Sequence, residues 1–154
     1  MITTNKSHLP VAVVVLSGEM NLEDVETLRR FYTAVHERGQ RFATIVDARR
    51  VRGTPSSPVR RALGELTNDF QDRSKRNLVG VATVLNSKIL IGALTAIRWF
   101  IREEVGELRY FDTAAAALVW IDAKLGAERQ ALPAPSRGFI ERLDGDDDVA
   151  TFGD

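Results

Sequence analysis

Arginine and serine side chains are concentrated in the short stretch from Arg49 to Arg61, and together they could bind an anion. Two serines lie among the arginines, and no acidic residue follows Asp47 within the stretch. Guanidinium groups bind carboxylates and phosphates through paired, charge-assisted hydrogen bonds. The sequence therefore predicts an anion site or an acidic-partner site, with a solvated basic loop as the alternative. Its candidate residues are Arg49, Arg50, Arg52, Ser56, Ser57, Arg60 and Arg61.

The stretch joins a buried strand to a helix. Residues 42–46 are apolar and mostly β-branched, which is typical of a strand buried on both faces in a parallel sheet. Ser57 is predicted to cap the helix, and Pro58 suits its first position. The free N–H groups and the dipole of such a helix end favour negative charge. The expected anion site therefore includes the start of this helix.

Few other residues could perform catalysis. Asp47 ends a strand where α/β proteins often place a catalytic acid, but a structural role as cap or turn residue is the alternative. His8 and His36 are predicted to be solvated surface histidines without metal-ligand company. The chain has no cysteine, no glycine-rich phosphate loop and no G-x-S-x-G nucleophile elbow. We therefore expect a protein that is not an enzyme and has no cofactor and no bound metal.

Composition narrows the class of protein. Twenty-one basic residues balance twenty-one acidic ones, which argues against a dedicated nucleic-acid binder. The first ten residues lack the apolar core of a signal peptide. No apolar run approaches the length of a membrane span. The expected location is a bacterial-type cytoplasm, without nucleic acid and without a membrane span.

Four apolar segments, each followed by a helical pattern, predict the fold. Because strands and helices alternate, we expect an α/β domain with a small, mainly parallel sheet of four to five strands, mixed at its edge, and four helices. Asn21, Asn86 or Ser87, and Asp112 or Thr113 are predicted helix caps. The predicted strands are Val11–Leu16, Phe42–Asp47, Leu78–Leu85 and Leu108–Phe111.

The helix predicted from Lys88 to Glu104 is apolar on nearly all sides. A helix without a polar side is usually buried on two sides. It is therefore a packed core helix, a homo-oligomer contact or the wall of an apolar ligand pocket. The candidate interface residues are Ile97, Trp99, Phe100 and Ile101.

The last part of the chain differs in composition. We expect a domain over residues 1–125 and a Pro- and Asp-rich tail over 126–154 that is largely flexible or loosely docked. Phe139, Ile140 and Leu143 have helical spacing and could dock as one short turn. Asp146–Asp148 form an acidic cluster, which we predict competes for the arginines.

The order of these segments resembles the STAS domains, the family of anti-sigma-factor antagonists (SpoIIAA-like) and of the cytoplasmic tails of sulphate transporters. The resemblance spans about residues 11–125 and includes VVVLSGEMNLEDVETL, FATIVDARRV, LVGVATVL and YFDTAAAALVWI. The closing Phe111, Asp112, Ala117, Leu118 and Trp120 are similar to the ending of many stand-alone bacterial members.

The resemblance implies a β-α superhelix that acts by binding another protein, commonly a serine kinase or another regulatory protein. It also implies a switch by serine phosphorylation at the start of the second helix, with Ser56 at the phosphoacceptor position and Ser57 beside it. Pro55 and Pro58 depart from the D-S-S-G pattern of the family. The expected function is a non-enzymatic signalling module. The alternative, from the apolar helix around Trp99, is a carrier of a lipid or other apolar small molecule.

Overall fold

A single mixed sheet forms the middle layer of the protein. The computed structural model describes residues 1–103 and 105–145. The five strands lie in chain order: β1 (Ile2–Asn5), β2 (Val11–Gly18), β3 (Phe42–Val51), β4 (Leu78–Val84) and β5 (Glu107–Phe111). The edge strand β1 pairs antiparallel with β2, and the other neighbours are parallel. The predicted small, mainly parallel sheet with a mixed edge is confirmed.

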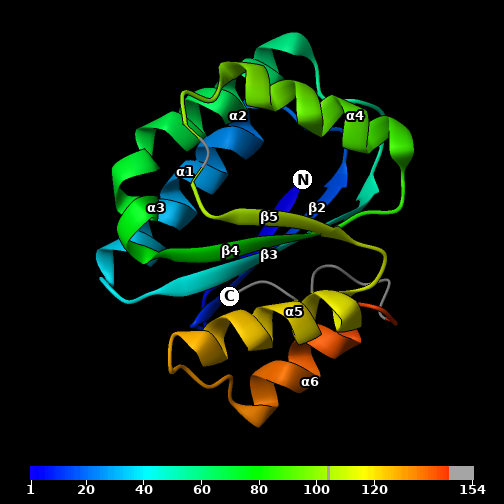
Figure 1. The fold of residues 1–154 in the computed structure, drawn as a ribbon. Coiled ribbons are helices and arrows are strands. Elements are labelled where there is room, and N and C mark those ends of the chain that lie inside the picture. Colours follow the sequence, from blue (N-terminus) through cyan, green and yellow to red (C-terminus); the bar gives the residue numbers. More distant parts are fainter. Residues whose placement is uncertain (104, 146–154) are drawn as a thin grey trace.

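Helices cover both faces of this sheet (Figure 1). On one side lie α1 (Leu22–Glu37), α2 (Ser57–Asp69), α3 (Gln71–Asn77) and α4 (Lys88–Ile97), with a 3₁₀ turn, η1 (Arg98–Phe100), after α4. On the other lie α5 (Ala114–Ala127) and α6 (Ala134–Arg142). Each central strand is therefore covered on both faces, as its apolar sequence predicts.

Because successive side chains of a strand point to opposite faces of the sheet, the core is divided into two clusters. Val11, Val13 and Val15 of β2 pack in the cluster that includes α5 and α6. Ala12 and Val14, which point the opposite way, pack in the cluster that includes α1 and α2. The sheet thus holds two cores apart, one beneath each helical layer.

Helix starts follow the caps expected from the sequence. Asn21 and Asp24 form a reciprocal capping box at α1. Ser87 Oγ accepts from Leu90 N at 3.3 Å, and Thr113 Oγ1 accepts from Ala116 N at 3.1 Å. The sequence offered two candidate N-caps for each of these helices, and the residues that cap them are Ser87 and Thr113.

The described residues hold six α-helices rather than four. The helix predicted to follow the arginine- and serine-rich stretch divides into α2 and α3 at the buried Phe70, whose φ of −94° and ψ of 1° leave helical geometry. The predicted Lys88–Glu104 helix ends at Ile97, and η1 follows it. There Asn68 of α2 binds the turn, donating to Phe100 O at 2.7 Å and accepting from Arg102 N at 2.8 Å. Glu104 lies outside the described residues.

The sixth helix, α6, belongs to the segment expected as a tail. Phe139, Ile140 and Leu143 are buried in the same cluster as α5. These three do dock at helical spacing, so a largely flexible or loosely docked tail does not describe residues 134–143. The domain boundary at residue 125 stays a prediction. Asp146–Asp148 lie outside the described residues.

Candidate functional site

Asp47 is the buried centre of the arginine-rich connection. It follows Ala43 and Ile45 at two-residue spacing, on the sheet face that α5 and α6 cover, and its side chain is fully buried. Its carboxylate accepts from Arg49 Nε at 3.0 Å and Nη2 at 2.7 Å, and from Arg50 Nη1 at 3.2 Å. Asp47 therefore has a structural role, since it fixes the orientation of two of the predicted anion-binding arginines.

The second partner of Arg49 is Asp144, which follows α6. Asp144 Oδ1 accepts from Arg49 Nη1 and from Ala114 N, both at 2.7 Å, and Oδ2 accepts from Ala115 N at 2.9 Å. Burial acts to raise the pKa of Asp144, but the two backbone N–H groups and the guanidinium outweigh it and lower the pKa below its usual value. An anion of the same chain thus occupies the N-terminus of α5, beside Arg49.

The start of α2 carries the two predicted serines. The helix begins at Ser57 with Ser56 as its N-cap, one residue earlier than predicted. The Ser56 side chain makes no capping hydrogen bond within the described part of the chain. Arg60 Nη1 donates to Pro55 O at 2.6 Å, and Nη2 donates to Ser57 Oγ at 3.0 Å. Both serines are exposed, with one arginine beside Ser57.

The remaining arginines have other surroundings. Arg61 lies over the Phe100 ring, with its Cζ atom 5.9 Å from the ring centroid. Arg52 is exposed, and its backbone N–H donates to Gly18 O at 2.9 Å. The predicted site residues therefore have separate partners: Arg49 and Arg50 at Asp47, Arg60 at Ser57, and Arg61 at η1. A single anion site that uses all of them stays a prediction.

The four predicted interface residues differ in exposure. Ile97 is buried, Phe100 and Ile101 are half-buried, and Trp99 is 84% exposed. Phe100 packs on α2 at Gly64, where a Cβ atom would lie 2.4 Å from the Phe100 Cβ. Within the described chain, Trp99 therefore gives the predicted interface its large exposed apolar surface.

Both histidines differ from the prediction of solvated surface side chains. His36 is 7% exposed and stacks on Phe70, with ring centroids 5.3 Å apart. Burial, with the positive charges of Arg73 and Arg76, lowers its pKa to about 4. His8 stacks on Phe139 at 4.1 Å, and its Nδ1 lies 3.0 Å from Ser136 Oγ. The charged sequence around His36 concealed its burial, since α1 turns it towards Phe42 and Phe70.

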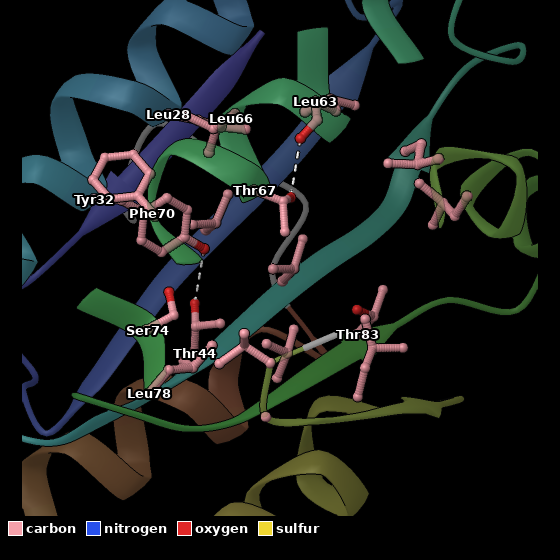
Figure 2. Close-up of a pocket in the computed structure, with 18 of the residues that line it drawn as sticks. Leu28, Tyr32, Thr44, Leu63, Leu66, Thr67, Phe70, Ser74, Leu78 and Thr83 are labelled. Atoms are coloured by element: carbon pink, nitrogen blue, oxygen red, sulfur yellow. Dashed lines mark hydrogen bonds between the residues drawn. The ribbon is translucent and has the colours of Figure 1, made fainter. Parts of the chain in front are cut away.

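A cavity of about 320 Å³ lies between the sheet and the α1–α4 layer. Figure 2 shows Tyr32, Leu66, Phe70, Thr44 and Thr83 around it, with Tyr32 OH 3.1 Å from Thr44 Oγ1. Leu94 and Ile97 of α4 also line it. The apolar helix predicted from Lys88 to Glu104 indicated a possible ligand pocket, but the residues that line the cavity come from elements far apart in the chain.

Other types of site were sought among the described residues. Residues 1–103 and 105–145 hold no group of three or more His, Cys, Asp or Glu side chains placed to bind a metal ion. Within the same ranges, no helix is both long and apolar enough to cross a membrane.

Comparison with known proteins identifies the fold. No protein-family model matches the chain, and no curated protein matches it. A solved structure from Shewanella loihica PV-4, an uncharacterised DUF3478-family protein with a SpoIIAA-like fold, superposes with a TM-score of 0.57 at 17% identity, over 79% of this chain and 92% of that one. An anti-sigma factor antagonist from Mycobacterium paratuberculosis superposes with a TM-score of 0.47 at 20% sequence identity, over 79% of this chain and 94% of that one. The comparisons lend no support to a lipid carrier built around Trp99. This chain is a protein of SpoIIAA-like fold.

Proposed function

We propose that this chain is a non-enzymatic protein-interaction module of STAS type, controlled by phosphorylation of Ser56 or Ser57. The observation that carries the proposal is the pairing of two exposed serines at the start of α2 with the exposed Trp99 on η1. The Arg61 guanidinium, one turn from Ser57, lies over the ring of Phe100, the chain neighbour of Trp99, and this contact supports a shared surface. The partner is a regulatory protein, such as a serine kinase.

Phosphate suits this helix start for electrostatic reasons. The first turn of α2, Ser57–Arg60, contains no acidic side chain, and Arg60 already lies against Ser57. A phosphoserine at a helix N-terminus accepts hydrogen bonds from free backbone N–H groups and from a nearby guanidinium. Phosphate on Ser56, the N-cap, would therefore fix the Arg60 side chain and add negative charge at the start of α2.

Trp99 supplies the apolar part of the proposed surface. Tryptophan and arginine are enriched among the residues that dominate protein–protein binding energy. Arg61 contacts Phe100, the chain neighbour of Trp99, so a partner that covers both η1 and the first turns of α2 would meet Trp99 and the phosphoserine position together. Phosphorylation would then change partner affinity directly, through a charge within the interface.

The test is cross-linking capture with a tagged chain expressed in its own cells. We expect the wild-type protein and Val119→Ala to retain the same stoichiometric partner, because Val119 is exposed on α5, on the opposite face of the sheet. Trp99→Ala should lose it. Intact-mass measurement, with and without phosphatase, should place one phosphate on Ser56 or Ser57. Equal capture by Trp99→Ala contradicts the surface, and a mass without phosphate in every growth phase contradicts the switch.

A further inference from the structure

The cavity under α2 and α4 is lined mainly by apolar groups. Its floor includes Val14, Thr44 and Val81 from three neighbouring strands. Its walls include Leu66 and Phe70. Binding sites for small molecules are typically concave, mostly apolar and furnished with a few polar groups. The space therefore has the composition of a ligand site as well as the position of one, between a sheet and its helical layer.

The cavity opens beside the edge strand β5. Leu108 and Tyr110 line it, yet they are 44% and 37% exposed. On an edge strand with free solvent on one side, large apolar side chains are normally avoided unless something covers them. Their position gives a ligand a path into the cavity that does not require the sheet to open.

Charge decides the class of ligand. Among the described residues that line the cavity, Arg98 alone carries a full charge at neutral pH, and it is an exposed residue. His36 is neutral because burial and nearby arginines lower its pKa to about 4. Burial raises the pKa of Tyr32, so its hydroxyl stays neutral too. Apart from Arg98, the described lining therefore offers an ionised group no counter-charge to offset the loss of its hydration.

Hydroxyl groups supply the polar contacts. Thr44 Oγ1 donates to Ala12 O at 3.1 Å, so at its 3.1 Å contact with Tyr32 it accepts the phenolic proton. The Tyr32 oxygen then retains lone pairs, and Thr83 and Ser74 add two further hydroxyls to the lining. A ligand with a single hydroxyl or carbonyl group matches this set.

We propose that this cavity binds one uncharged, mainly apolar molecule that carries a hydroxyl or carbonyl group. Because a cavity of about 150 Å³ accepts benzene, a volume of about 320 Å³ corresponds to roughly a dozen non-hydrogen atoms. The ligand lies against Thr44, Tyr32 and Val81, on the opposite side of α4 and η1 from the solvent that surrounds Trp99. This site is independent of the proposed phosphorylation switch.

The test uses 1-decanol as probe and decanoate as its charged twin, followed by methyl NMR of the lining leucines and valines. We expect 1-decanol to shift the Leu66 and Leu94 methyls saturably, and decanoate at pH 8 to bind at least about tenfold more weakly. Val81→Phe should fill the cavity and abolish the shifts. Val119→Phe, the same substitution on the exposed surface of α5, should leave them unchanged.

Three results overturn the proposal. The first is the absence of saturable shifts with 1-decanol in the wild-type protein. The second is equal binding by Val81→Phe, which would place the probe elsewhere. The third is decanoate binding as tightly as 1-decanol, which would contradict an uncharged ligand. If Val81→Phe does not fold, Leu94→Phe fills the same cavity from α4 and provides the same comparison.

Discussion

Arg49 and Asp144 lie 95 residues apart in the chain, and their side chains meet at 2.7 Å between Nη1 and Oδ1. The pair joins the end of β3 to the residue that follows α6. Because Asp144 also accepts from the first N–H groups of α5, one carboxylate ties together a strand and two helices. Asp144 pairs with Arg49 at the N-terminus of α5, whereas Asp146–Asp148, the acidic residues predicted to compete for the arginines, lie outside the described residues.

We expect Asp144→Asn to lower the free energy of unfolding by about 1.5–3 kcal/mol, since it removes charge-assisted hydrogen bonds from a partly buried group. Asp122→Asn is the matched control, because Asp122 pairs with Arg137 at a more exposed position and should cost below about 1 kcal/mol. Urea unfolding measures both. The lowered pKa of Asp144 also means that its stabilisation is present above its usual pKa and is lost as pH falls through the folded value. Equal costs for the two variants would contradict this role.

His36 predicts a separate pH dependence. Its folded pKa of about 4 lies below the unfolded value of about 6.5, so the unfolded chain binds the proton first as pH falls. Stability is therefore full above about pH 6.5 and declines between about 6.5 and 4, by about 2 kcal/mol at pH 5. His36→Phe, which keeps a ring against Phe70, should lack this part of the decline in urea titrations at pH 7.5 and 5. A parallel decline in both proteins would show that other groups cause it.

The central strands β2 and β3 were predictable because they are buried on both faces, where most side chains are apolar. The segment Val11–Leu16 illustrates this, since no other local structure of that length suits an unbroken run of β-branched and apolar residues. Helix caps were predictable for a similar reason, because a side chain such as Asn21 satisfies a backbone N–H within its own turn.

The candidate site was less predictable, because its contacts join residues far apart in the chain. Arg49 pairs with Asp144 of its own chain, a partner that could not be inferred without the position of α6, and its predicted role in an anion site stays a prediction. The end of α4 was missed for the same reason. Phe100 leaves the helix to pack on Gly64, which lies on a different helix. The burial of His36 likewise depends on Phe42 and Phe70, which surround it only after folding.

Trp99 should contribute little to the stability of a single chain. Its side chain is 84% exposed, so Trp99→Ala should change the free energy of unfolding by less than about 0.5 kcal/mol. A core tryptophan would instead cost roughly 3–5 kcal/mol on truncation. Sedimentation velocity provides the second measurement: if the homo-oligomer predicted from the apolar helix exists and uses Trp99, the variant should sediment as a folded monomer. If the wild-type protein is a monomer and Trp99→Ala still greatly lowers the free energy of unfolding, Trp99 belongs to the core and the exposed position is contradicted.

Gly64 and Gly92 provide a matched pair for the packing of η1 on α2. Both lie within helices, so Gly→Ala raises the intrinsic helix propensity by about 1 kcal/mol at each. At Gly92 a new Cβ meets nothing within 4 Å, and Gly92→Ala should therefore stabilise the protein by about 0.5–1 kcal/mol.

At Gly64 the new Cβ would lie 2.4 Å from the Phe100 Cβ, so η1 must move away from α2. We expect Gly64→Ala to destabilise the protein by about 1–3 kcal/mol despite its better propensity, and to shift the amide resonances of Asn68 and Arg102, whose hydrogen bond spans this contact. Thermal unfolding and amide NMR measure the two effects, and stabilisation of equal size by both substitutions would contradict the close packing of Phe100 on Gly64.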